Sequence, residues 1–321
     1  MGRTNPQMPT PHSPQSTDHF CLPTAVGPGQ RITVLGPTAS GKTRFAVRLA
    51  DQLDGEILSV DSRQVYRRMD LGTGKDLDDY WIRGRRIPVH LIDLVEPGTK
   101  FNVFEYQQAF EIAFNDVVQR GKCPILCGGS GMYLESVLKG YDLTYVPPDH
   151  ELRRTLEACP QEELNRLLAE LRPLHNRSDT TSKKRTIRAI EIARYQEAHP
   201  TPQNQTQLPG RTPGLVLGLH VDRPLLRERI TRRLHQRLEQ GLVDEVRNLL
   251  DSGIPADTLV YYGLEYKFVT LYLQGTLPYD EMVERLNIAI HQFSKRQMTW
   301  FRRMERNGLA IHWIDMGAEG A

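Results

Sequence analysis

Short apolar runs and longer helical patterns alternate along most of this 321-residue chain. Six apolar runs have the length of buried strands: residues 31–35, 56–60, 89–93, 123–127, 214–219 and 311–315. Apolar residues at helical spacing follow several of them, for example from Phe104 to Val118. A strand followed by a helix, repeated along the chain, predicts an α/β fold with a parallel sheet.

The pattern changes between residues 141 and 212, where no strand is expected. Helical spacing predicts three helices there, near 149–158, 161–170 and 181–197. A polar stretch with several prolines, 200–213, then leads back to the sheet pattern. We therefore expect a sheet core formed by 30–140 and 213–317, interrupted by a helical insertion at 141–212.

Composition and charge add a few expectations to the pattern of strands and helices. The first 29 residues hold six prolines and no apolar core, which predicts a disordered tail. No apolar run approaches the roughly 18 residues of a membrane span. The four cysteines are scattered without a metal-ligand pattern, which suits the reducing cytoplasm. Because the net charge is only +2, any affinity for nucleic acid must come from local clusters.

The main candidate for chemistry is a G-x-x-x-x-G-K-T motif between the first strand and the first helix. Its residues are Gly36, Pro37, Thr38, Ala39, Ser40, Gly41, Lys42 and Thr43. In such a phosphate-binding loop (P-loop), backbone N–H groups and the helix N-terminus attract an anion. Lys42 would then contact the outer phosphate oxygens, and the Thr43 hydroxyl would bind Mg²⁺. The motif predicts a site for a diphosphate or triphosphate.

Asp61 ends the second strand, and the carboxyl ends of parallel strands face the ligand in open α/β sheets. The residues alone leave three roles open. Asp61 organises Mg²⁺, acts as a general base for an acceptor, or caps the N-terminus of a following helix.

Two other stretches are expected near the carboxyl ends of the strands. The glycine-rich run from Gly128 to Tyr133 predicts either a close approach to a ligand or a tight strand-to-helix turn. The polar, turn-rich stretch 72–88 is interpreted as a mobile loop beside the site, and its part from Asp78 to Arg86 carries no further prediction.

Basic residues gather in three places outside the P-loop. Residues 183–188 put cations at a helix start, against the helix dipole, which favours an anionic partner over a solvated basic face. Arg229 and Arg233 share a helix face and form either a second diphosphate clamp or a surface salt-bridge face. In 295–303, arginines alternate with Trp300 and Phe301, an RNA-binding pattern unless the two aromatics are core residues.

Five motifs together resemble the tRNA dimethylallyltransferase family. They are the P-loop at 36–43, Ser-Val-Asp-Ser-Arg-Gln-Val-Tyr at 59–66, Gly-Gly-Ser-Gly-Met-Tyr at 128–133, Arg-Ala-Ile-Glu at 188–191 and Lys-Arg-Gln-Met-Thr-Trp-Phe-Arg at 295–302. The resemblance implies a P-loop NTPase-like core with a helical tRNA-binding insertion. It also implies transfer of a dimethylallyl group from its diphosphate to N6 of adenosine 37, in tRNAs that read codons beginning with U. An ATP-dependent kinase of a small molecule or nucleotide is the alternative that the P-loop alone permits.

The resemblance also implies roles for individual residues. Asp61 becomes the base, with Lys42 and Thr43 as the other catalytic residues, and Mg²⁺ binds at Thr43. The diphosphate is held by residues 36–43 with Arg229 and Arg233. The anticodon stem-loop of tRNA is contacted by Asp61, Ser62, Arg63, Gln64, Ser130, Lys184, Arg185, Arg188, Lys295, Arg296, Gln297 and Arg302. We expect a cytoplasmic monomer without a membrane partner.

The chain departs from the family pattern in the stretch 258–266. The family often has Gly-Tyr-Arg-Gln where this chain has Gly263-Leu264-Glu265-Tyr266. The missing positive charge puts an RNA contact in doubt at this position. Ser130 stands where a threonine is common, and it keeps the hydroxyl group.

Overall fold

The computed structural model describes residues 30–140, 145–171, 180–199 and 214–317. The predicted tail at 1–29 and the linker at 200–213 lie outside these residues. The chain divides into two compact units, one formed by Met1–Gly140 with Pro209–Ala321 and the other by Tyr141–Leu208. Across the described residues, every helix is too short or too polar to span a lipid bilayer.

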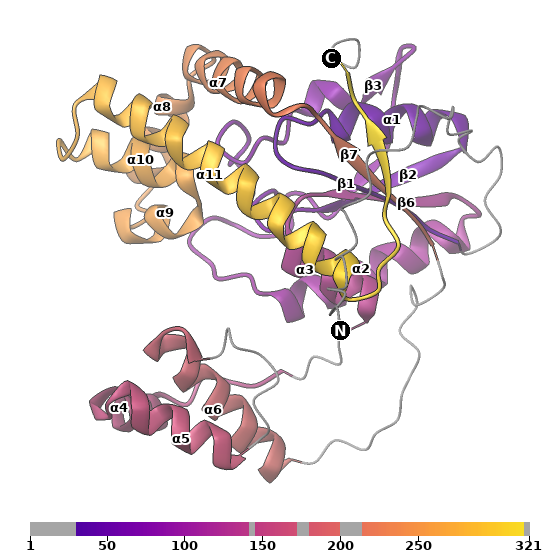
Figure 1. Ribbon diagram of the computed structural model, residues 1–321. Coiled ribbons are helices and arrows are strands. Elements are labelled where there is room, and N and C mark those ends of the chain that lie inside the picture. Colours follow the sequence, from indigo (N-terminus) through magenta and orange to yellow (C-terminus); the bar gives the residue numbers. More distant parts are fainter. Residues whose placement is uncertain (1–29, 141–144, 172–179, 200–213, 318–321) are drawn as a thin grey trace, which may run out of the picture. The chain divides into compact units, whose positions relative to one another are not determined.

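A six-stranded parallel sheet forms the centre of the first unit (Figure 1). Its strands, in spatial order, are β5 (Val89–His90), β2 (Gly55–Val60), β6 (Cys123–Gly128), β1 (Ile32–Leu35), β7 (Leu215–His220) and β8 (His312–Asp315). Because β2, β6 and β1 are parallel neighbours, the loops that follow these strands meet at one edge of the sheet. Strand β5 is shorter than the predicted 89–93 because Leu91 adopts a left-handed conformation (φ 67°) that ends the extended backbone.

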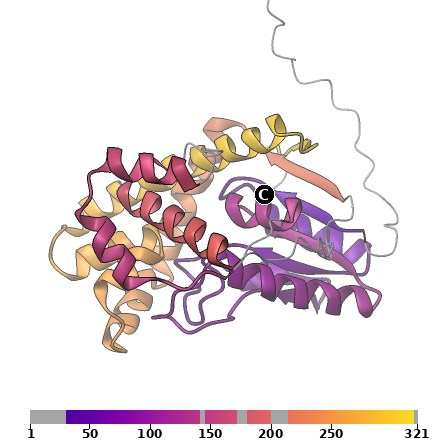
Figure 2. The same ribbon diagram turned by 90° about the horizontal axis from the view of Figure 1, so that it is seen from below.

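Helices cover both faces of this sheet, as the view in Figure 2 shows. They are α1 (Lys42–Gln52), α2 (Val103–Gln119), α3 (Gly131–Lys139), α7 (Arg223–Glu239), α8 (Leu242–Asp251), α9 (Ala256–Tyr262), α10 (Leu264–Leu273) and α11 (Tyr279–Arg306). On one face α1 packs on alternate strand residues such as Val34 and Ile57. The other alternate residues, such as Leu58 and Leu126, pack in a larger core to which α2, α3 and α7–α11 contribute. Burial on both faces explains why the strand runs are continuously apolar.

Local signals in the sequence set several helix ends. Asn102 accepts hydrogen bonds from the backbone N–H groups of Phe104 and Glu105, and the Glu105 side chain accepts from the Asn102 N–H, so a capping box begins α2. Pro224 lies in the first turn of α7, where its missing N–H costs nothing. The predicted helix 104–118 therefore corresponds to α2 within one residue at each end.

In the described residues of the second unit, 145–171 and 180–199, three helices surround a small core of their own. They are α4 (His150–Ala158), α5 (Gln161–Leu171) and α6 (Lys183–Ala198), close to the three predicted segments. Leu156, Leu164 and Ile190 are among the residues that form the core. The buried Glu191 carboxylate accepts a bidentate pair of bonds from Arg153, at 2.9 and 2.8 Å, and a bond from the Asp149 N–H.

The stretch interpreted as a mobile loop contains regular structure, so that interpretation is corrected. It includes a 3₁₀ helix, η1 (Leu77–Tyr80), and a two-stranded hairpin of β3 (Trp81–Ile82) and β4 (Arg85–Arg86). Tyr80 and Ile87 are buried in the core between α1 and the face of the six-stranded sheet that α1 covers. Polar flanking residues hid these two apolar anchors in the sequence.

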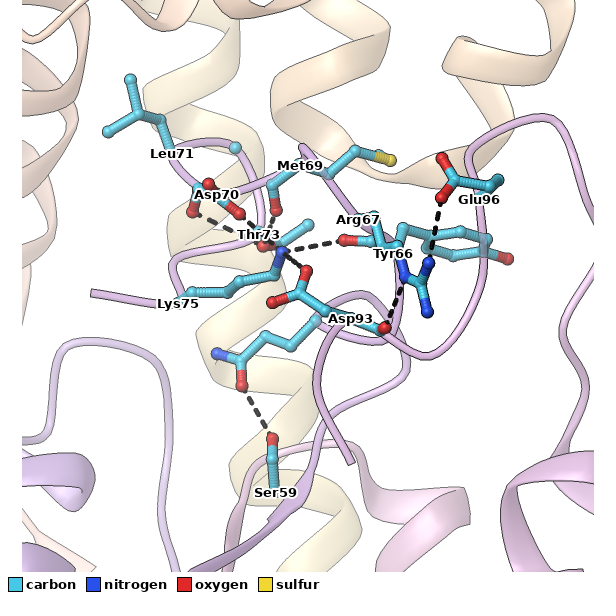
Figure 3. Close-up of polar contacts among 12 residues, drawn as sticks. Ser59, Tyr66, Arg67, Met69, Asp70, Leu71, Thr73, Lys75, Asp93 and Glu96 are labelled. Atoms are coloured by element: carbon cyan, nitrogen blue, oxygen red, sulfur yellow. Dashed lines mark hydrogen bonds and ion pairs between the residues drawn. The ribbon is translucent and has the colours of Figure 1, made fainter. Parts of the chain in front are cut away.

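The fully buried Lys75 fixes the start of this stretch (Figure 3). Its ammonium group donates to the Tyr66 carbonyl at 2.8 Å and to the Asp70 and Asp93 carboxylates, each at 2.5 Å. Three donors and three acceptors are therefore matched around one buried charge, which is what burial of an ammonium requires.

Glu245, on α8, holds the same segment from the other side. Its carboxylate accepts from the successive backbone N–H groups of Asp70, Leu71 and Gly72 at 2.8, 2.8 and 3.0 Å. The Tyr266 hydroxyl donates to it as well, at 2.7 Å. Residues 70–76 are thus tied to the core from two directions.

We predict that Lys75→Met lowers the free energy of unfolding by about 2–3 kcal/mol, because two carboxylates and a carbonyl lose their shared donor. The half-exposed carboxylates keep some hydration, which limits the loss. Urea denaturation measures the change, with Lys100→Met, which removes an exposed lysine, as the control. A loss equal to that of the control would show that the Lys75 contacts contribute little.

Candidate active site

A large cavity lies at the carboxyl ends of the strands. Its volume is about 1480 Å³. The P-loop, the ends of β2 and β6, the segment 70–80 and residues of α7, α9, α10 and α11 line it. The topology thus brings together stretches that are far apart in the sequence.

The P-loop turns from β1 into α1 as the motif predicts. Gly41, immediately before α1, has a φ of 84°, a left-handed conformation that favours glycine. The N-terminus of α1 therefore faces the cavity, and Lys42 and Thr43, its first two residues, line it. The Lys42 ammonium donates to the Pro37 carbonyl at 2.8 Å. Its burial lowers the pKa of Lys42 to about 8.

Gln297, on α11, joins the P-loop to the second glycine-rich turn. Its Oε1 accepts from the Thr38 N–H at 2.8 Å, and its Nε2 donates to the Gly129 carbonyl at 3.0 Å. The side chain is buried, 7% exposed. Both ends of the Gln297 amide are thus bonded within the protein, at a position that lines the cavity, and its RNA contact stays a prediction.

Asp61 lines the cavity at the end of β2. Its Oδ1 accepts from the Arg63 N–H at 2.8 Å in a turn, and no helix begins there, so the helix-cap alternative is wrong. The backbone N–H of Ser62, the residue after Asp61, donates to the Ser130 hydroxyl oxygen at 3.0 Å. Ser130 thus ties the end of β2 to the turn after β6.

Four arginines of α7 line the cavity, and three of them, Arg229, Arg233 and Arg237, follow one another at spacings of four. Arg229 donates to the Gly317 carbonyl at 3.3 Å. Arg233 and Arg237 both form ion pairs with Asp76, the latter at 3.0 Å. The sequence analysis named Arg229 and Arg233 but missed Arg237, although continuing the same spacing by one turn predicts it.

The other predicted RNA-contacting residues of this unit differ in their surroundings. Lys295, Arg296 and Arg302 are exposed on α11. Trp300 is half-buried and lines the cavity, whereas Phe301 is fully buried in the core. Gln64 accepts from Ser59 Oγ and donates to the Gly74 carbonyl, so its amide is occupied within the protein as well.

The basic residues of the second unit differ in their contacts. Lys184 and Arg185 are exposed at the start of α6. Arg188 instead pairs with Glu191 and donates to the Val146 carbonyl at 2.8 Å. A folding role therefore accounts for the Arg188 guanidinium, while Lys184 and Arg185 face solvent.

The divergent stretch 258–266 contributes an exposed aromatic ring to the cavity. Tyr261 is 58% exposed, and the Arg63 guanidinium lies 5.4 Å from the centre of its ring. Tyr262 is buried and accepts from the Gly98 N–H at 2.6 Å. The sequence analysis assigned no role to Tyr261, because no motif signals a tyrosine at a cavity mouth.

Comparison with known proteins decides the family. A family model described as IPP transferase matches residues 64–304. The tRNA dimethylallyltransferases 1 of Parabacteroides distasonis and of Porphyromonas gingivalis are each 57% identical over 88% of this chain, covering 92% and 93% of their own lengths. The chain belongs to the tRNA dimethylallyltransferase family. The resemblance inferred from five motifs is therefore confirmed.

Solved structures of the family agree with this fold. The tRNA isopentenylpyrophosphate transferase of Bacillus halodurans is 32% identical, with a TM-score of 0.63 and 90% of each chain covered. A eukaryotic dimethylallyltransferase that acts on tRNA has a TM-score of 0.74 over 90% of this chain and 74% of its own, at 22% identity. The predicted P-loop NTPase-like α/β core is confirmed for the family.

The lowered pKa of Lys42 generates a pH-dependence prediction. A bound diphosphate favours the charged ammonium, so the complex gains a proton above the Lys42 pKa of about 8. The affinity for a diphosphate ester should therefore fall between pH 8 and 9, by up to about tenfold. The ester itself is fully ionised there, since its last pKa is about 6.

Titration calorimetry at several pH values measures this effect. The control is Lys42→Arg, whose guanidinium stays charged over the whole range. An affinity of the wild-type protein that does not change between pH 7 and 9 would contradict the assignment of Lys42 to the diphosphate.

Proposed function

We infer that this protein transfers a dimethylallyl group from dimethylallyl diphosphate to N6 of adenosine 37 in tRNAs that read codons beginning with U. Membership of the tRNA dimethylallyltransferase family supports the reaction class. The observation that carries the assignment is that the P-loop and Asp61 line the same cavity. A phosphate cradle beside a carboxylate suits a reaction that releases diphosphate and removes a proton.

The chemistry follows from these two groups. The amine nitrogen forms a bond to C1 of the allyl group while the bond from C1 to the diphosphate oxygen breaks. Loop amides, Lys42 and Arg233 stabilise the negative charge that grows on the departing diphosphate. The proton lost by the amine passes to Asp61, whose Oδ1 is oriented by the Arg63 N–H. Products are N6-isopentenyladenosine and diphosphate.

A Mg²⁺ ion fits the oxygen donors at this site. Thr43 lines the cavity at the start of α1, and magnesium commonly binds through few protein ligands and the phosphates of its substrate. Thr43 would hold the ion together with diphosphate oxygens. When bound, Mg²⁺ supplies further neutralisation of the leaving group.

The adenine must leave the anticodon-loop stack to reach Asp61. The cavity volume of about 1480 Å³ exceeds what a small diphosphate needs and leaves space for a nucleoside. Tyr261, Trp300 and Met132 offer apolar surface around that space. We propose that the anticodon stem-loop is gripped by the basic residues of α11 and α6, and that the protein acts as a cytoplasmic monomer.

The kinase alternative is not favoured. Its support was the P-loop alone, and one structural feature of this kind can serve unrelated functions. The curated relatives are named as tRNA dimethylallyltransferases at 57% identity, and the family model matches most of the chain. ATP binding, which the kinase alternative implied, is not required under this proposal.

The transfer reaction and the base are tested together. Labelled dimethylallyl diphosphate and unmodified tRNA should yield labelled N6-isopentenyladenosine without ATP. Asp61→Asn should reduce kcat by about 10²–10⁴-fold while leaving donor affinity within a few-fold, because base catalysis typically contributes that much. Asp51→Asn, which changes an acid of α1 outside the cavity, is the control. Transfer of γ-phosphate from ATP with unmodified tRNA would refute the proposed function, and full kcat in Asp61→Asn would refute the base.

The salt dependence of tRNA binding tests the second unit. Lys184→Gln with Arg185→Gln should weaken tRNA binding and lower the slope of log K against log salt by about 1.5, if each contacts one phosphate. Arg48→Gln with Arg86→Gln removes the same charge from exposed positions outside the cavity and outside α6 and α11, and should leave the slope unchanged. Equal slopes for both double variants would show that α6 does not bind the RNA backbone.

A further inference from the structure

Asp76 lies in the cavity between two arginines and opposite the P-loop. Its carboxylate pairs with Arg233 and Arg237, and Arg233 Nη1 lies 3.5 Å from the Thr38 hydroxyl of the P-loop. We propose that Asp76 is a positioning residue that holds the Arg233 guanidinium toward the diphosphate, with Arg237 anchoring Asp76 in turn. The proposal rests on the proposed function for the identity of the diphosphate.

The position of Asp76 is itself built into the fold. It follows Lys75, whose buried ammonium fixes residues 70–76, and its own φ is 44°, a left-handed conformation that surrounding contacts must hold. Gly74 lets the segment approach α7 closely, because a Cβ there would collide with Arg237 Nη2 and lie 2.9 Å from Arg233 Nη2. The loop backbone and the two guanidiniums therefore fit each other without space for a side chain.

The Asp76 carboxylate reduces the repulsion between the positive charges of Arg233 and Arg237. Arg237 is 8% exposed, and two neighbouring guanidiniums repel each other more strongly where burial lowers the local dielectric constant. Burial on its own would raise the pKa of Asp76, but Arg233 and Arg237 outweigh it and hold the pKa below its ordinary value. Asp76 is thus ionised at neutral pH. One carboxylate against two guanidiniums leaves a net positive charge for the diphosphate.

Glu265 does not replace Asp76 as the counter-ion. It lines a small cavity behind the P-loop together with Thr38, Arg233 and Arg237. Among the described residues no ion pair joins Glu265 to either arginine, whereas Asp76 pairs with both. Removing the Asp76 charge would consequently leave the buried Arg237 without its ion pair, and Arg233 without the contact that directs it.

The test compares variants that act through Arg233 with one that does not. Asp76→Asn and Arg237→Met should each weaken binding of dimethylallyl diphosphate about tenfold or more, the loss of a charge-assisted hydrogen bond. The KM for tRNA and the kcat at saturating donor should stay within about threefold. Asp79→Asn is the matched control, because Asp79 also lines the cavity but pairs with the largely exposed Arg44.

Double variants separate positioning from a general effect of charge. Asp76→Asn combined with Arg233→Met should bind the donor no more weakly than Arg233→Met alone, since both changes remove the same contact. Multiplied effects, or donor binding in Asp76→Asn that is unchanged or tighter, would overturn the proposal. If Asp76→Asn fails to fold, Arg237→Met carries the same expectation, because methionine fills the buried volume.

Measurements on the wild-type protein separate the positioning role of Asp76 from the proposed transferase function. Wild-type protein that neither binds nor uses dimethylallyl diphosphate would refute both. Normal transfer by the wild type, together with wild-type donor affinity in Asp76→Asn and Arg237→Met, would refute only the positioning role.

Discussion

The site depends on one buried amide that holds two glycine-rich loops together. Gln297 bonds the Thr38 N–H of the P-loop and the Gly129 carbonyl after β6, so α11 fixes the distance between these loops. Ser130, in the second loop, in turn receives the N–H of Ser62, next to Asp61. The phosphate cradle and the carboxylate are therefore parts of one bonded assembly. Preorganisation of this kind reduces the ordering that substrate binding must bring about.

The cations of the cavity are held in place before any anion arrives. Lys42 has the Pro37 carbonyl, Arg229 the Gly317 carbonyl, and Arg233 the Asp76 carboxylate as partners. Each acceptor keeps a buried positive charge from lying unpaired, which would cost several kcal/mol. A diphosphate can add to these contacts or replace the weaker carbonyl ones. The cavity therefore carries cations that the protein itself positions, and their charge suits an anion.

Local patterns predicted the elements and the loops of the site, but not the contacts between distant residues. The strands, the helices α2 and α4–α6, and the P-loop followed from apolar periodicity and one motif, because those signals lie within a few neighbouring residues. Gln297 was expected to contact RNA because it lies in a stretch that resembles an RNA-contacting motif of the family, and its partners 259 and 168 residues away are invisible to any local pattern. Lys75 shows the same limit, since a lysine in a polar stretch indicates exposure until a fold supplies Asp70 and Asp93.

The divergent stretch 258–266 shows how the fold changes the meaning of a substitution. The sequence has Glu265 where the family often has an arginine, and this suggested a loss of positive charge. In the structure Arg237, on α7, lies beside Glu265 and lines the same cavity, so a positive charge is present there from another element. Tyr261 of the same stretch adds an aromatic ring next to Arg63. The electrostatic character of the cavity is consequently a property of residues that meet in space, and one departure from a motif does not determine it.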